Sequence, residues 1–175
     1  VLRERDAYAA YCDLLETALA RCPLQVAHFC LMPNHIHLLV QADAIAPLSQ
    51  AMHQLQRRYW FYAKRRYGLT GHLWQGRFHS FPIESEAYLL EAARYIERNP
   101  LEAKLSTALT AYPWSSYRFY ATGSSAALSL VATPLYEALG TSATARQAAY
   151  RQFVETPQPY DRSMRQKLQR VTAYA

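Results

Sequence analysis

The sequence predicts an α+β domain in which helices and short strands alternate. Two features predict it: segments whose apolar residues recur every three or four positions, and short runs rich in β-branched and aromatic residues. In chain order these segments read α-β-β-α-β-α, and the sequence contains no internal repeat. At 175 residues the chain suits one domain of ordinary size with a small C-terminal addition.

The first helix and the hairpin after it have recognisable boundaries. Asp6 can cap a helix whose apolar residues recur at helical spacing, and Pro23 ends it. Two β-type runs follow, LQVAHFCL at 24–31 and HIHLLVQ at 35–41. The MPN between them is typical of a turn, so we expect an antiparallel hairpin.

A second helix is predicted from Pro47 to Arg66, and Gly68 can end it. One apolar stripe along this helix comprises Leu48, Met52, Leu55, Tyr59 and Tyr62. A loop rich in glycine and aromatic residues follows and leads into a third β-type run, RFHSFPI at 77–83. This run is the last strand that we expect.

Ser85 can cap a third helix that runs to Arg98, because Pro100 limits the helix from behind. Residues 1–120 then form the main domain, and ATGSSAALSL opens a linker at 121–133.

The C-terminal extension is expected at 134–175. It contains two segments with helical spacing, 134–155 and 161–171, which we expect to pack as short helices on the main domain.

Composition narrows the class of protein. The three cysteines form no C-x-x-C pair and are better read as small buried residues in a reducing cytoplasm. No apolar stretch is long enough to cross a membrane. The net charge of +6 is compatible with a polyanionic partner, although many basic proteins bind no nucleic acid.

Two histidines lie one residue apart in the second β-type run. Because side chains alternate along a strand, His35 and His37 face the same side, roughly 6–7 Å apart along the chain. Ile36, Leu38 and Val40 face the other side and contact the core. Such a pair suits chelation of one divalent ion, but two hydrogen-bonded histidines on a half-buried strand would give the same pattern.

Several blocks of sequence share one resemblance. The block MPNHIHLL, which holds His35 and His37, resembles the HUH motif (histidine, hydrophobe, histidine) of REP-associated tyrosine transposases and related insertion-sequence transposases. The block YIERNP at 95–100 is similar to the Y-I-x-x-N-P of that family, and GHLWQGRF and WSSYRFY resemble it further along. The resemblance covers roughly residues 5–120, in the family's order.

This resemblance implies a fold and an activity. The fold is the HUH endonuclease fold, a ferredoxin-like antiparallel sheet with helices on one face that begins with a strand before the first helix. VLRER cannot supply that first strand, so either upstream residues form it or the sheet is completed in another way. The implied activity is cleavage and rejoining of single-stranded DNA at hairpin-forming repeated palindromes.

The resemblance also assigns roles to individual residues. It implies that Tyr95 is the nucleophile, which forms a 5′-phosphotyrosine, and that His35, His37 and Asn99 hold a divalent metal ion, Mg²⁺ or Mn²⁺. Helical spacing places Tyr95 and Asn99 on one side of the third helix, beside its inward stripe. A core tyrosine and an ordinary helix-end asparagine would show the same spacing. Glu91 is a candidate general base or a solvated surface acid.

A DNA-binding surface is expected on the second helix and the loop after it. Arg57, Arg58, Lys64 and Arg65 form a basic ridge opposite or beside the apolar stripe, and they would give affinity and salt dependence. A solvated face would look similar. The loop residues that can stack on or contact a single strand are His72, Trp74, Arg77 and Phe78, of which Trp74 could equally be core. Trp114 and Tyr117 are read as packing residues.

Two further functions stay open at this point. One is a hairpin-DNA-binding protein of the same fold with little or no catalysis, and the other is an unrelated H-x-H metallohydrolase. The partner is expected to be single-stranded or hairpin DNA, with neither a membrane nor a small-molecule substrate. A monomer is expected, because the C-terminal helices could cover a dimerisation surface.

Overall fold

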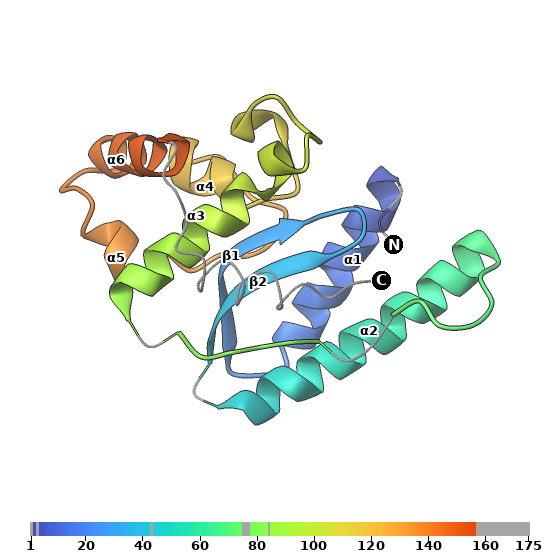
Figure 1. Cartoon of the computed structure of the whole chain (residues 1–175). Coiled ribbons are helices and arrows are strands. Elements are labelled where there is room, and N and C mark those ends of the chain that lie inside the picture. Colours follow the sequence, from blue (N-terminus) through green and yellow to red (C-terminus); the bar gives the residue numbers. More distant parts are fainter. Residues whose placement is uncertain (1, 3, 43, 75–77, 84, 157–175) are drawn as a thin grey trace.

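The computed structural model describes residues 2, 4–42, 44–74, 78–83 and 85–156 (Figure 1). Its elements in chain order are α1 (Arg5–Leu19), β1 (Leu24–Leu31), β2 (Ile36–Ala42), α2 (Ile45–Tyr67), α3 (Glu86–Glu102), η1 (Leu109–Ala111), α4 (Tyr117–Thr122), α5 (Pro134–Glu137) and α6 (Ala143–Glu155). The mixed α+β class predicted from the sequence is confirmed, and the strand at 24–31 has the predicted bounds.

The strands β1 and β2 pair antiparallel as the predicted hairpin, with Cys30 opposite His37 and Leu31 opposite Ile36. The turn is closed by a backbone hydrogen bond from the Met32 N–H to the His35 carbonyl, 2.8 Å long. In the described residues the sheet has these two strands and no others. No strand precedes α1 within the residues that the structure describes.

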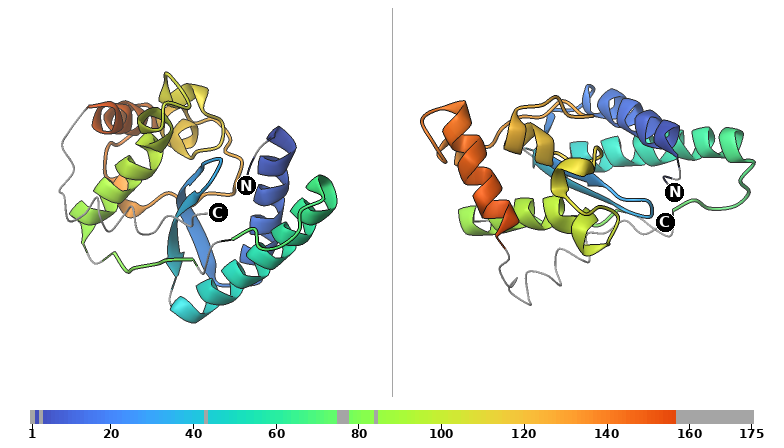
Figure 2. Two further views of the ribbon diagram at one scale, coloured as in Figure 1. Left: turned by 45° about the vertical axis from the view of Figure 1, so that its right-hand side comes forward. Right: turned by 90° about the horizontal axis from the view of Figure 1, so that it is seen from above.

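Helices cover both faces of this sheet, not one face as expected. One hydrophobic cluster joins α1 and α2 to the face that carries Phe29 and Ile36. A second cluster joins α3 to the opposite face, which carries Cys30 and Leu39. Figure 2 shows the hairpin between α1 and α2 on one side and α3 on the other. The reason lies in β1, where seven of eight residues are buried, so neither face of this strand can be left to solvent.

The third β-type run is not a strand where it can be described. Residues 78–83 form no strand and pair with no neighbour in the described part of the chain. Their apolar side chains are used for packing instead: Phe78 packs against the first cluster, and Phe81 and Ile83 against the second. The β-type pattern of apolar residues here therefore reflects side chains that are used for packing, and it is not accompanied by the hydrogen-bonded ladder of a strand.

The helices follow the sequence signals with small shifts. α1 starts at Arg5 after Glu4, so Asp6 lies in its first turn rather than at its cap. α2 buries the predicted stripe and ends at Gly68, whose φ of 64° is the left-handed conformation that favours glycine. The Ser85 hydroxyl accepts a hydrogen bond from the Tyr88 N–H and caps α3 as predicted.

Pro100 does not stop α3, which continues to Glu102. A proline removes the backbone donor that would bond to the carbonyl four residues earlier, and α3 ends two residues after this loss. The chain then leaves through Lys104, whose φ is 57°.

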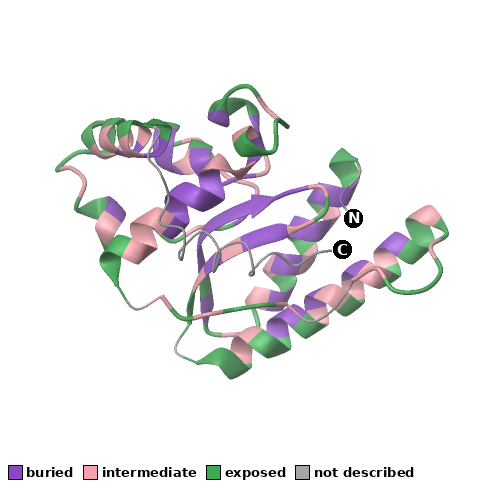
Figure 3. Ribbon diagram, in the orientation of Figure 1, coloured by how far each residue is buried: buried purple, intermediate pink, exposed green. Residues whose placement is uncertain are grey.

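The segment predicted as a linker, 121–133, contacts the sheet. Leu128 is buried in the first cluster, and the Val131 N–H donates to the Val26 carbonyl over 2.9 Å. α4 and α6 pack together beside α3, whereas the predicted helix at 161–171 lies outside the described residues. Among the described helices, none is long and apolar enough to cross a membrane. Figure 3 shows that burial is concentrated on the two strands and on the helix faces toward them.

Candidate functional site

Three elements bring the predicted catalytic residues together. His35, at the end of the turn, and His37, on β2, face α3 with ring centroids 4.9 Å apart. The Tyr95 ring of α3 meets the His37 ring edge to face at 5.4 Å. Asn99 lies one helical turn after Tyr95 on the same side. Two imidazoles, a phenol and an amide therefore share one small site.

Burial keeps both imidazoles neutral. His37 is 3% exposed, and desolvation, with a smaller contribution from neighbouring His35, lowers its pKa to about 3. Desolvation also lowers the pKa of His35, which is less deeply buried. The Asn99 side chain favours the protonated form of each ring and so opposes this effect in part. Neutral imidazole nitrogens are the form in which histidine binds metal ions.

Hydrogen bonds orient the polar atoms around the two rings. The Asn99 amide nitrogen donates to the Tyr95 carbonyl over 2.8 Å, which leaves the amide oxygen to act as the acceptor on the histidine side. Nδ1 of His35 lies 2.8 Å from the Oδ1 of Asn34, an acceptor, so the lone pair of His35 resides on Nε2.

The residues present fit a divalent metal ion. Nε2 of His37 is buried and has no hydrogen-bond partner among the described residues. In the tautomer that carries its proton on Nδ1, this nitrogen offers its lone pair to a cation. The described residues contain no group of three or more His, Cys, Asp or Glu side chains that could hold an ion. A third ligand at this site would therefore come from the Asn99 oxygen.

Glu91 is engaged elsewhere. Its carboxylate accepts a hydrogen bond from the buried guanidinium of Arg94 over 2.5 Å. This contact directs the Glu91 carboxylate toward a neighbour on its own helix.

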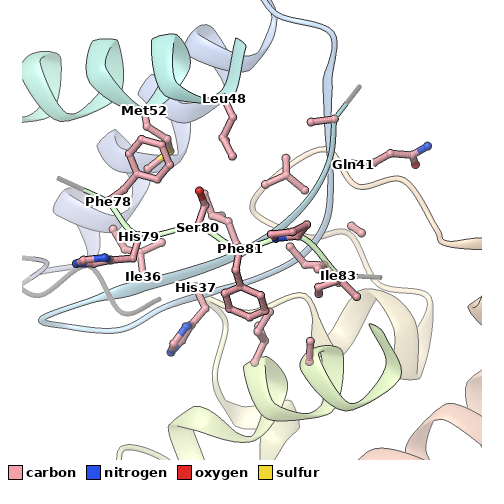
Figure 4. Close-up of a pocket in the computed structure, with 18 of the residues that line it drawn as sticks. Ile36, His37, Gln41, Leu48, Met52, Phe78, His79, Ser80, Phe81 and Ile83 are labelled. Carbon is pink, nitrogen blue, oxygen red and sulfur yellow. The ribbon is translucent and has the colours of Figure 1, made fainter. Parts of the chain in front are cut away.

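A pocket of about 780 Å³ lies beside His37 (Figure 4). It is bounded by the outer edge of β2, the start of α2, residues 78–83 and α3. His37 is one of its few polar lining residues, and Met52, Phe81 and Ile83 contribute to its apolar walls. The outer edge of β2, which pairs with no other strand in the described residues, therefore opens on an apolar space.

The basic ridge lies on α2 as predicted from the helical spacing. Arg57, Lys64 and Arg65 are exposed and Arg58 is half-buried. Within the described chain, none of the four forms an ion pair with a carboxylate. Sequence reasoning missed Phe61, which is 49% exposed at the centre of this ridge.

The predicted loop residues separate into two groups. His72 is exposed, whereas Trp74 and Phe78 are half-buried and pack against the first cluster. The Trp74 indole also donates to the Gln56 carbonyl over 3.1 Å, which favours its reading as a packing residue. Arg77 lies outside the described residues.

Trp114 and Tyr117 pack as predicted. The Trp114 ring stacks on Tyr8 with centroids 4.8 Å apart, and Tyr117 is fully buried.

A buried polar cluster that sequence reasoning missed lies on the α6 side of α3 and is formed by His28, Glu97, Ser116 and Tyr150. The Glu97 side chain is fully buried, and its Oε1 accepts a hydrogen bond from the Ser116 hydroxyl over 2.6 Å. Nδ1 of His28 lies 3.0 Å and the Tyr150 hydroxyl 3.4 Å from the same oxygen. These four residues are far apart in the sequence, so no local pattern could reveal them.

Comparison with known families decides the class of protein. The family model described as "Transposase IS200 like" matches residues 2–99, more than half of the chain. The chain belongs to the IS200-like transposase family. The match includes the hairpin with both histidines and α3 as far as Asn99, so the whole candidate site of this transposase lies within it. No curated protein and no solved structure matches the chain.

Because the chain belongs to this family, its partner is DNA and its class of activity is DNA cleavage and transfer. The matched segment ends at residue 99, so η1 and helices α4–α6 lie outside it.

Proposed function

We propose that this transposase cuts and rejoins single-stranded DNA at hairpin-forming repeated palindromes through a covalent link to Tyr95. The observation that carries the proposal is the contact between the Tyr95 and His37 rings, which brings a phenol from α3 to the histidine pair of the hairpin. The resemblance of MPNHIHLL and YIERNP to REP-associated tyrosine transposases supports the kind of DNA.

The proposed reaction is a transesterification in two steps. The Tyr95 oxygen attacks the scissile phosphorus, and its proton leaves to a base or solvent. The bond from phosphorus to the 3′ oxygen breaks, and the departing oxygen takes up a proton from solvent. The products are a free 3′-hydroxyl and a 5′-phosphotyrosine. In the second step another 3′-hydroxyl attacks the same phosphorus, Tyr95 regains its proton, and the DNA is rejoined with no external energy source.

We propose His35, His37 and Asn99 as the residues that hold a divalent ion, Mg²⁺ or Mn²⁺. The neutral imidazoles and the unsatisfied Nε2 of His37 support this donor set. When bound, such an ion would polarise a non-bridging phosphate oxygen and help to orient the strand. Nitrogen ligands suit Mn²⁺ better than Mg²⁺.

The ridge on α2 is proposed to bind the phosphates. Its cations form no ion pairs in the described chain, so they can neutralise phosphate charges without first breaking a salt bridge. Contacts of this kind supply affinity and orientation, and they leave the choice of sequence to other groups.

A ferredoxin-like sheet is proposed as the complete fold of the catalytic domain, with a further strand paired to the outer edge of β2. The unpaired edge and the apolar pocket between it and residues 78–83 support this arrangement. Hydrogen exchange tests it: the outward-facing amides of β2 would be protected in a protein that carries such a strand and would exchange rapidly in one that does not.

One observation favours a second function, binding of hairpin DNA without cleavage. Tyr95 is only 6% exposed, so little of this residue is open to an approaching phosphate. The two functions differ in whether a covalent product forms.

A gel assay under denaturing conditions decides between them. The protein is incubated with Mn²⁺ and a labelled single strand that contains a palindromic hairpin. We expect a labelled band at the mass of the protein plus the 3′ fragment, and mass spectrometry should place the link on Tyr95. If the protein binds this strand but forms no covalent band at any metal concentration, cleavage is excluded and binding of hairpin DNA without cleavage is the function supported.

A further inference from the structure

Phe61 is a large apolar side chain that the fold leaves in solvent. The inner side of α2 buries Leu55, Tyr59 and Ala63 against α1 and the sheet, whereas Phe61, on another side of the helix, is 49% exposed. It contributes to neither face of the sheet in the described chain.

The surroundings of Phe61 are basic at every helical neighbour. Arg57 and Arg58 lie four and three residues before it, and Lys64 and Arg65 lie three and four residues after it. On an α-helix these are the positions whose side chains adjoin that of Phe61. One exposed ring is therefore surrounded by four cations.

The Phe61 ring is also braced. The Trp60 ring meets it edge to face at 4.9 Å, and the Trp60 indole is fixed by a hydrogen bond of 2.9 Å to the Gly71 carbonyl. The Lys64 ammonium lies over the Trp60 ring, 5.0 Å from its centroid. A braced aromatic ring loses little conformational entropy when another ring stacks on it.

We propose that Phe61 is a stacking site for an unpaired base of the DNA strand, with the four cations around it binding the adjoining phosphates. This inference rests on the proposed DNA function and assigns the base contact within it. An apolar protein partner would not need four cations around the ring, whereas a nucleotide offers both an aromatic base and a negative charge.

The test measures binding of a hairpin oligonucleotide with a short single-stranded tail, using the Tyr95→Phe variant so that no cleavage intervenes. Phe61→Ala should weaken binding by roughly 5- to 150-fold, the usual range for one stacked base. Phe61→Trp should preserve binding, and the slope of affinity against salt should not change in either variant.

Ile45→Ala is the matched control, because Ile45 is the other large apolar side chain exposed on α2, at 60%, and it has no basic ridge around it. A fluorescent base in the tail should be quenched by the parent protein and not by Phe61→Ala. Equal binding by Phe61→Ala and Ile45→Ala, or no binding of the oligonucleotide at all, would overturn the stacking site. A stacking effect without a covalent product in wild-type protein would overturn only the proposed cleavage.

A second inference rests on the buried polar cluster. Glu97 follows Tyr95 by two residues, so the two side chains leave α3 about 200° apart. Glu97 is held by Ser116, His28 and Tyr150, whereas Tyr95 faces His37. Because a helix rotates about its axis as a rigid body, contacts that hold Glu97 also set the direction in which the Tyr95 side chain points.

We infer that Glu97 is a positioning residue, which sets the rotation of α3 and thereby aims Tyr95 at the histidine pair. Two of its partners, Ser116 and Tyr150, lie beyond the segment that the family model matches. The Arg98 guanidinium adds a parallel link, since it donates to the Val154 carbonyl at the end of α6 over 2.9 Å. The C-terminal helices thus act on the site through α3.

Glu97→Gln and Ser116→Ala test this role against Tyr136→Phe, which removes a buried hydrogen bond of 2.8 Å, to the Tyr120 carbonyl, away from Glu97. We expect the rate of covalent-product formation at saturating DNA to fall by up to about 100-fold in the first two variants, because small misplacement of a reacting group has a large effect. The Kd for DNA should change less than about twofold.

An NMR readout needs no activity. The imidazole signals of His37 sense the Tyr95 ring and should move in Glu97→Gln and Ser116→Ala but not in Tyr136→Phe. Unmoved His37 signals in folded Ser116→Ala protein would overturn the positioning role. If the His37 signals move in Glu97→Gln and Ser116→Ala but the wild type forms no covalent product, the proposed cleavage would be overturned, whereas the positioning role of Glu97 would stand.

Discussion

The rings of His37 and Tyr95 meet edge to face with their centroids 5.4 Å apart, although one belongs to β2 and the other to α3. The contact places a potential nucleophile against a neutral imidazole in a site that is largely closed to water. In such a site electrostatic interactions are stronger than in water, so small changes in either residue should have large chemical effects.

We expect His35→Ala and His37→Ala, made separately, to abolish cleavage of a hairpin-bearing single strand. Each removes one nitrogen of the proposed metal-binding pair, whereas most of the affinity is proposed to come from phosphate contacts on α2, so DNA affinity should stay within a few fold. Cleavage gels and filter binding on the same preparations measure both quantities. Full cleavage by either variant, together with EDTA-resistant cleavage by the wild type, would exclude the metal role.

Tyr95→Phe should eliminate the covalent product and leave the fold nearly unchanged. The ring and its contact with His37 are retained, and loss of one hydroxyl costs about 0.5–1.5 kcal/mol of unfolding free energy. Urea unfolding measures the stability, and the covalent-product gel measures the chemistry. Tyr88→Phe, on the same helix with its hydroxyl also buried, is the control and should cleave normally. A covalent product in Tyr95→Phe would move the nucleophile to another tyrosine.

The stability of the metal-free protein should fall as the pH falls from about 6.5 toward 3. In the unfolded chain His37 takes up a proton near its ordinary pKa of about 6.5, whereas in the fold its pKa is lowered to about 3. Between these values the unfolded state binds the extra proton, so low pH favours unfolding, by about 1.4 kcal/mol per pH unit.

The comparison with His37→Gln isolates this contribution, because glutamine does not titrate. Urea unfolding of both proteins in EDTA across this window should show the wild type losing stability faster than the variant. Parallel pH profiles for the two proteins would mean that His37 is not held neutral by the fold.

The basic ridge should determine the salt dependence of DNA binding. In the double variant Arg57→Ala/Lys64→Ala, the slope of log affinity against log salt should become shallower by roughly 0.7 for each lost single-strand contact. Arg21→Ala/Arg118→Ala removes two exposed cations elsewhere and should leave the slope unchanged. Equal slopes in the two double variants would make the ridge an ordinary solvated face.

The sequence by itself determined the local elements and the residue types of the site. The bounds of β1, the turn before His35, the serine cap of α3 and the glycine end of α2 all follow from preferences that act within a few residues. The side on which His35 and His37 lie follows from strand geometry alone, because alternation along a strand has period two.

Tertiary structure decided which surfaces meet. Residues 78–83 have a β-type pattern but form no strand, because their apolar side chains pack against clusters built from segments distant in the sequence. Tyr95 contacts His37, and Glu97 is buried among His28, Ser116 and Tyr150. These contacts join segments that are distant in the sequence, in one case by 122 residues. Local preferences act over single turns and hairpins, whereas burial of apolar surface is a property of the whole chain, so only the complete fold could bring these groups together.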